Sequence, residues 1–207
     1  MRLDHVSYAC APSEIADVVQ RIGSDLGVTF VDGGRHPSFG TRNFTGALAN
    51  GSYIEVVSAL DHPAALKAPF GQAVHHRAEA GGGWLSWVVA VDDITTVEAH
   101  LGRKAASGQR IRPDGTVLRW RQIGVLDTMN DPVVPFFVEW ESPESDHPST
   151  RGGRVAIERF EMSGDTDVLG SLTPSVTSLL TVEWVDDDTP GIVAIWFDSP
   201  HGPVRID

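Results

Sequence analysis

The chain has 207 residues, of which 41% are hydrophobic and 21% charged, so it is long enough to bury a full core and is not a disordered chain. Its 28 acidic and 16 basic residues give a formal charge of −12, which argues against nonspecific binding to nucleic acid or to an anionic membrane. Cys10 is the only cysteine, which excludes an intramolecular disulfide and a thiolate metal cluster. Because no apolar signal segment follows Met1 and no apolar run approaches about twenty residues, we expect a cytoplasmic protein.

The first sixty residues predict a β-α-β-β-β unit. The expected elements are a strand at 2–9, a helix at 13–26 and strands at 28–31, 41–48 and 52–58. Ser13 is the expected N-cap of the helix, and Gly27 is expected to end it. A glycine-rich loop is expected at 32–40. Asn50-Gly51 lies between the last two strands, where this dipeptide is a strong hairpin signal.

The same order of elements repeats after a linker at 61–82, which is predicted from Pro63, Pro69 and the glycine run that begins at Gly81. The second copy has strands at 84–91, 105–112, 117–125 and 135–141 and a helix at 93–101. A shorter third copy has strands at 154–162, 179–185, 192–197 and 204–206 and a helix at 165–172. The repeat period of about 80 residues is too long for a solenoid. We therefore expect an α+β fold. Paired β-α-β-β-β modules (1–60 and 83–142) form a cupped mixed β-sheet, and an appended C-terminal half-module (153–207) packs on the same sheet.

His5 and Glu55 are ligand-capable side chains in the strands that open and close the first module. Successive side chains of a strand point to opposite faces, so Val6 and Tyr8 share one face while His5 lies on the other. The apolar neighbours of Glu55 likewise lie opposite its carboxylate. If both apolar faces cover the helix, His5 and Glu55 emerge together on the far face, as in a metal or acid–base site.

The first module contains four motifs that are informative in combination: Leu3-Asp4-His5-Val6, Gly33-Gly34-Arg35-His36-Pro37, Gly40-Thr41-Arg42-Asn43 and Tyr53-Ile54-Glu55. In them the chain resembles the vicinal oxygen chelate superfamily, which includes glyoxalase I, ring-cleaving dioxygenases and bleomycin-resistance proteins. The pattern looks most like the glyoxalase-like domain group. The resemblance covers residues 1–141, and the final third fits more loosely.

The resemblance implies a divalent metal held by the first and last strands of each module. These positions fall on His5, Glu55, Trp87 and Glu139. An indole cannot ligate a metal, so the implied ligands are His5, Glu55 and Glu139, and Trp87 becomes a cleft wall for an apolar or aromatic substrate. Another ligand could come from His36, His75 or His76. The sequence does not choose among Mn, Mg, Fe, Ni and Zn, and a protein without metal also remains open.

Glu139 is the first choice for the base that moves a proton, and Glu55 is the second. His36, Arg42 and Asn43 are expected to line the cleft mouth, where the guanidinium fork of Arg42 suits a substrate carboxylate.

These assignments imply a glyoxalase-like, metal-dependent lyase or isomerase acting on a small oxygenated metabolite. One alternative is a non-catalytic protein that sequesters a drug-like or aromatic ligand, as bleomycin-resistance relatives do. Another is a degenerate module kept for association with a second chain. The expected partner is a small molecule, and formation of a homodimer remains open.

Overall fold

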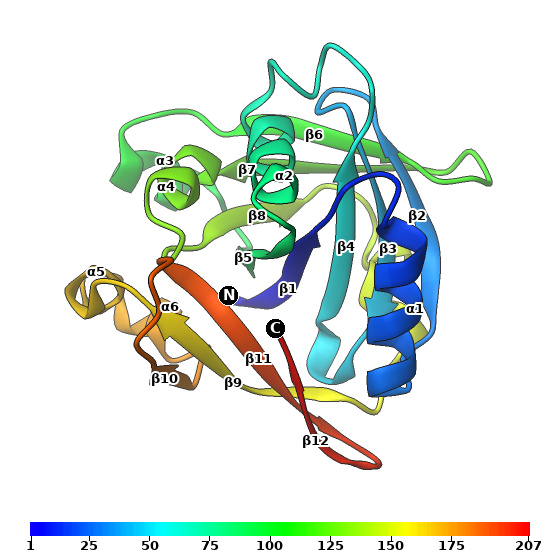
Figure 1. The fold of residues 1–207 in the computed structure, drawn as a ribbon. Helices are drawn as coiled ribbons and strands as arrows, with labels where there is room; N and C mark the ends of the chain where they lie inside the picture. Colours follow the sequence, from blue (N-terminus) through cyan, green and yellow to red (C-terminus); the bar gives the residue numbers. More distant parts are fainter.

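The computed structural model describes residues 1–207, and its centre is a closed barrel in the strand order β1-β4-β3-β2-β6-β7-β8-β5 (Figure 1). The first module supplies β1 (Arg2–Ala9), β2 (Phe30–His36), β3 (Thr41–Ala47) and β4 (Tyr53–Ala59), and the second supplies β5 (Gly83–Ala90), β6 (Ala106–Ile111), β7 (Val117–Ile123) and β8 (Phe136–Trp140). Within each module the first and last strands pair in parallel, whereas β1 and β5 join the modules antiparallel. The predicted α+β fold of paired modules is confirmed.

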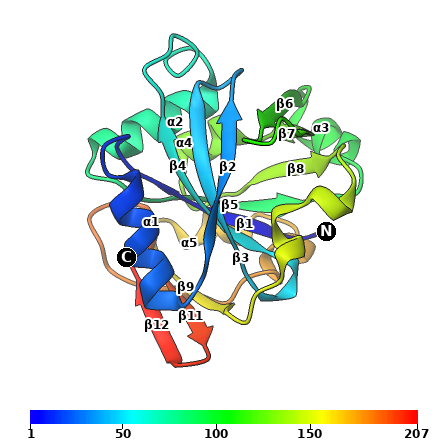
Figure 2. The same cartoon turned by 90° about the vertical axis from the view of Figure 1, so that its right-hand side faces the viewer.

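The helices α1 (Ile15–Leu26) and α3 (Thr95–Leu101) follow the first strand of each module. Each ends at a glycine in the left-handed conformation, Gly27 with φ 67° and Gly102 with φ 64°. Ser13 does not cap α1. The N-cap position belongs to Glu14, whose carboxylate accepts a hydrogen bond from the Ala11 N–H. Helix α1 lies on the outside of the barrel and touches the last strand, β12 (Gly202–Ile206) (Figure 2).

Two further helices were not predicted from the sequence. Helix α2 (Pro69–Glu79) occupies half of the segment taken as a linker, and α4 (Val125–Asn130) precedes β8. The prolines and glycines of the linker mark the ends of α2 and not an absence of structure. Pro69 stands in its first turn, where a missing N–H costs nothing, and Gly81 has a positive φ beyond its end. None of the helices is long and apolar enough to cross a membrane.

The glycine-rich segment predicted as a loop is mostly strand. β2 continues through Gly33 and Gly34 to His36, with a bulge between Asp32 and Gly34. At Gly34, where φ is 104°, a Cβ atom would collide with the backbone carbonyl of Ile111 in β6. The glycine therefore lets the backbones of β2 and β6 approach closely, at the seam where the two modules close the barrel. Short 3-10 turns lie at Ala49–Gly51, Glu144–Asp146 and Pro148–Arg151.

The C-terminal residues build a separate sheet in the order β10-β9-β11-β12 and add no strand to the barrel. Its elements are β9 (Ala156–Ser163), α5 (Thr166–Gly170), α6 (Pro174–Thr177), β10 (Val182–Trp184), β11 (Gly191–Ser199) and β12 (Gly202–Ile206). One face of this sheet shares a buried core with α1 and the outer side of β1 and β5. Trp84 marks the contact, because its ring lies 6.2 Å from that of Phe197 and its indole N–H donates to the Ile206 carbonyl.

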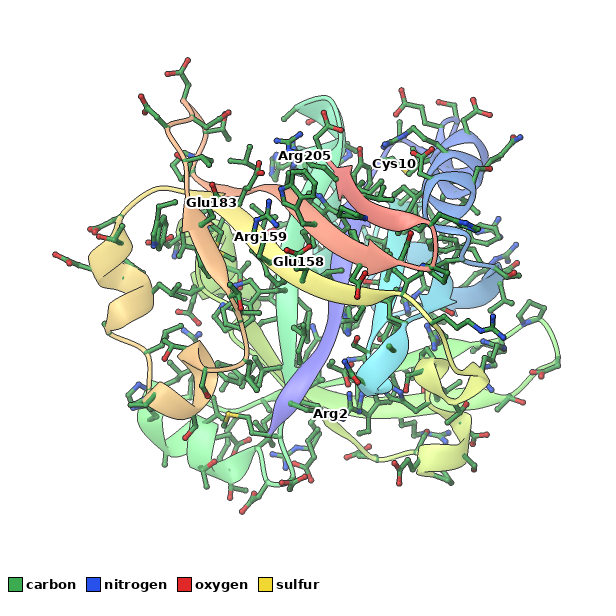
Figure 3. The ribbon with its side chains drawn as sticks, turned by 90° about the horizontal axis from the view of Figure 1, so that it is seen from below. Arg2, Cys10, Glu158, Arg159, Glu183 and Arg205 are labelled. Atoms are coloured by element: carbon green, nitrogen blue, oxygen red, sulfur yellow. The ribbon has the colours of Figure 1, made fainter.

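The other face of the C-terminal sheet is charged. Arg159 on β9 lies between Glu158 and Glu183, with N–O distances of 2.7 and 3.0 Å (Figure 3). The Arg159 guanidinium also lies 4.3 Å from the ring centre of Trp196. This face is therefore directed to solvent, and the apolar face holds the sheet against the barrel.

Candidate active site

His5 and Glu55 both point into the barrel, where they line a cavity of about 30 Å³. Other polar side chains of its wall are His36, Asn43, Arg110 and Gln122. Aromatic side chains enclose the remainder, including Phe70, which reaches the cavity from α2. A volume of this size holds about one water molecule, so a larger ligand needs some of these rings to move.

A β-bulge sets the orientation of His5. In the pairing of β1 with β5, Leu3 faces Val89 and His5 faces Val88, so Asp4 is the extra residue. The Asp4 side chain is fully buried, and its Oδ2 lies 2.8 Å from His5 Nδ1. An ionised carboxylate only accepts hydrogen bonds, so Nδ1 carries a proton, and Nε2 is directed to the other side of the ring, toward Glu55.

Asp4 is held in its ionised form. Burial raises the pKa of this carboxyl, but hydrogen bonds from His147 and His5 outweigh burial and bring the pKa well below its usual range. The indole N–H of Trp140 also donates to Asp4, and Arg2 forms an ion pair with it at 2.8 Å. Asp4 therefore acts as a fixed anion behind the His5 ring.

Glu55 lies on the other side of that ring, with Oε2 at 3.8 Å from His5 Nε2. Its two oxygens accept hydrogen bonds from Ser7 Oγ at 2.7 Å and from Asn43 Nδ2 at 2.6 Å. Burial raises the Glu55 pKa, but attraction to His5 and His36 and these two hydrogen bonds lower it overall. Asp4, His5 and Glu55 thus form a buried series of carboxylate, imidazole and carboxylate.

His36 is neutral in the same cavity. Its Nδ1 lies 2.8 Å from Thr41 Oγ1, and its ring packs edge-on to Trp120 and Phe70. Burial lowers the pKa of His36 to about 4. The sequence-based expectation that His36 and Asn43 share a site with Glu55 agrees with this geometry, although they lie inside the barrel and not at a cleft mouth.

Arg110 is a site residue that the sequence analysis missed. Its side chain is 2% exposed and lines the cavity from β6. Its Nε has no hydrogen-bond partner, and the guanidinium forms no ion pair. The signal was present in the strand pattern, since Gly108 and Arg110 alternate with exposed neighbours as the two buried positions of β6.

Glu139 does not join His5 and Glu55. It lies on the outer face of β8, where Oε2 accepts a hydrogen bond from the Ile94 N–H and lies 3.6 Å from Arg121. The predicted convergence fails because Val138, and not Glu139, faces the cavity. A shift of one residue in the alignment of two strands moves every side chain to the opposite face.

The same shift misplaced Trp87. Val88 is the residue opposite His5, whereas Trp87 is fully buried in the core outside the barrel and donates its indole N–H to the Val133 carbonyl. Arg42 also faces outward. It pairs with Asp32 at 2.9 Å and lies over the ring of Phe44, so its fork is already engaged.

The residues present do not fit a metal held by His5, Glu55 and Glu139. Without Glu139 the cavity offers a single carboxylate, and both oxygens of Glu55 already accept hydrogen bonds. No group of three or more His, Cys, Asp or Glu side chains in the chain is arranged to hold a metal ion. His75 is not a substitute ligand, since it lies on α2 with Nε2 at 3.4 Å from Glu79.

A second, larger cavity of about 500 Å³ lies outside the barrel, between α2, α4, β5 and β11. Its wall includes Trp84, Met129 and Ile192 together with Arg77. Phe136 belongs to the walls of both cavities. This side chain therefore lies between the small chamber inside the barrel and the larger one outside it.

The comparison with known proteins found one matching family model and several similar solved structures. A family model described as a glyoxalase-like domain matches residues 3–174. No curated protein matches the sequence. A hypothetical protein from Staphylococcus aureus is 16% identical over 100% of this chain and 85% of its own, with a TM-score of 0.63, and this likeness shows the fold alone.

Methylmalonyl-CoA epimerases from two organisms are more distant in structure. The protein from Streptomyces coelicolor is 16% identical over 69% of this chain and 99% of its own, with a TM-score of 0.47. The protein from Mycobacterium tuberculosis is 15% identical over 69% of this chain and 89% of its own, with a TM-score of 0.45.

Proposed function

The chain belongs to the glyoxalase-like domain family, within the vicinal oxygen chelate superfamily, and we propose that it is a lyase or isomerase that moves a proton on a small oxygenated metabolite inside the barrel. A fold hosts many activities, so the site must carry the assignment. The observation that carries it is the buried series of Asp4, His5 and Glu55, in which an imidazole with one free nitrogen stands between two carboxylates.

His5 is the proposed base. Its Nε2 takes a proton from a carbon next to a carbonyl group, and the resulting imidazolium is stabilised by Asp4 on one side and Glu55 on the other. The same imidazolium then gives the proton to a leaving oxygen or to the neighbouring carbon. In the second case the hydroxyl group of the substrate passes its proton to the former carbonyl oxygen. Glu55 is the second group able to accept the proton, and Ser7 and Asn43 fix its position. No step of this proposal uses a metal.

A non-catalytic binding function is the second candidate. The observation in its favour is the apolar cavity of about 500 Å³ beside the barrel, because ligand pockets for drug-sized molecules have roughly this volume and lining. In that case the barrel chamber would be a structural network, and His5 and Glu55 would not exchange protons with a bound molecule.

Exchange of carbon-bound hydrogen distinguishes the two candidates. The protein is incubated in D₂O with a panel of small hydroxy- and oxo-compounds, and ¹H NMR follows the loss of C–H signals next to carbonyl groups. We expect catalysed exchange of at least one compound, reduced by about 10² or more in His5→Gln and Glu55→Gln. Glu183→Gln, which changes an exposed glutamate of the C-terminal sheet, is the matched control and keeps the wild-type rate.

Exchange at the same rate in wild type and in both site variants would contradict the proposal. Binding of an apolar fluorescent probe without exchange of any compound in the panel would support the second candidate.

A further inference from the structure

The guanidinium of Arg110 is a buried charge without a counter-ion in contact. It is 2% exposed, its Nε is an orphan donor, and it forms no ion pair. The Glu55 carboxylate lines the same cavity but contacts Ser7 and Asn43 instead. A buried charge that is neither paired nor hydrogen-bonded is costly, so its retention points to a partner that comes from outside the chain.

The surroundings of Arg110 suit an anion. Tyr53 lines the cavity, and burial raises the pKa of its phenol well above the usual value, so the phenol keeps its proton and can donate. Gly33 leaves space beside the guanidinium because it carries no side chain. A Cβ atom there would collide with Asn43 Oδ1 and would stand 3.0 Å from Arg110 Nη1.

We propose that Arg110 binds the carboxylate of the substrate, and that the substrates are small monoanionic 2-hydroxy or 2-oxo acids. The planar fork of a guanidinium matches a carboxylate with two parallel hydrogen bonds. Glu55 is ionised in the same cavity, so a dianion such as a phosphate monoester meets stronger repulsion than a carboxylate does. The choice of acids with an adjacent oxygen rests on the proposed function, since His5 and Glu55 then face the carbon that loses its proton, which is C2 of a 2-hydroxy acid and C3 of a 2-oxo acid.

Binding of defined probes tests the inference directly. Pyruvate and lactate are titrated into the intact protein by calorimetry, in parallel with the neutral compounds pyruvamide and lactamide. We expect the acids to bind at least about tenfold more tightly than the amides, and Arg110→Gln to remove this preference. Arg110→Lys keeps the charge without the fork and should retain part of the preference.

Arg35→Gln is the matched control, because Arg35 lies on the neighbouring strand β2 with an exposed side chain. It removes the same charge from the sheet and should bind both acids as the wild type does. Thermal unfolding establishes whether each variant is folded. If Arg110→Gln does not fold, the inference is still tested by Arg110→Lys and by the comparison of acids with amides in the wild type. The inference is overturned if the acids do not bind the wild type, if they bind no better than the amides, or if Arg110→Gln binds them unchanged.

The outcomes separate this inference from the proposed function. Carboxylate binding that depends on Arg110 without deuterium exchange supports the anion subsite and contradicts the proton-transfer function. Exchange of a carboxylic acid at a rate unchanged in Arg110→Gln supports the function and overturns the subsite.

Discussion

His36 is expected to make the protein less stable as the pH falls from neutral toward 4. Its pKa is about 4 in the folded protein and 6.5 as a model value, because burial disfavours the charged ring. Between these values the unfolded chain binds more protons than the folded one, so the free energy of unfolding decreases as the pH falls below 6.5. The difference in pKa corresponds to about 3 kcal/mol once the pH is below 4.

The comparison that isolates this effect is between wild type and His36→Gln, which keeps a polar side chain but cannot titrate. Urea unfolding is measured for both at about pH 7.5 and about pH 4.5. At the lower pH most of the His36 contribution has been lost, whereas most of the effect of carboxylates with lowered pKa values, such as Glu55, comes at still lower pH.

We expect the wild type to lose roughly 2–3 kcal/mol more than the variant between the two conditions. Equal losses in both proteins would show that His36 is not buried as a neutral ring, and an imidazole signal titrating near pH 6.5 by NMR would lead to the same conclusion.

Three further predictions follow from the geometry. Glu139→Gln should leave the rate of deuterium exchange within about twofold of the wild-type rate, since the Glu139 carboxylate contacts the Ile94 N–H outside the barrel. A loss as large as that expected for Glu55→Gln would show that Glu139 belongs to the site. Gly33→Ala should lower the midpoint of thermal unfolding, by an amount corresponding to about 1–3 kcal/mol, because the added methyl group collides with Asn43. Cys10 should resist iodoacetamide in the folded protein at pH 8 and react after unfolding, because burial raises the pKa of its thiol to about 11.

The architecture could be predicted because it depends on local patterns that repeat. Alternation of apolar residues marks the strands, and glycines such as Gly27 and Gly102 mark helix ends through their positive φ. The missed helix α2 shows the limit of breaker residues as signals. Pro69 and Gly81 were read as evidence of a linker, although both are compatible with the two ends of a helix.

The sequence placed candidate side chains together correctly in the first module but not in the second. His5 and Glu55 lie on adjacent parallel strands, two residues apart in register, so alternation placed them on one face. For the second module the prediction relied on superposing its sequence on the first, and strand register is not readable from two short apolar strands. An error of one residue put Glu139 in the place of Val138 and Trp87 in the place of Val88. In each case an outward residue was taken for one that faces the inside of the barrel.

The corrected register changes the chemistry expected of the barrel. A symmetric metal site needs donors from both modules, but the inward positions of β5 and β8 at the level of the cavity hold Val88 and Val138. The second module instead contributes apolar wall and the buried Arg110 of β6. Proton-accepting groups therefore come from one module and the anion-binding charge from the other. A small acid lying between them would be held by its carboxylate on one side while His5 and Glu55 reach its reactive carbon from the other, so a single pair of modules forms one asymmetric site.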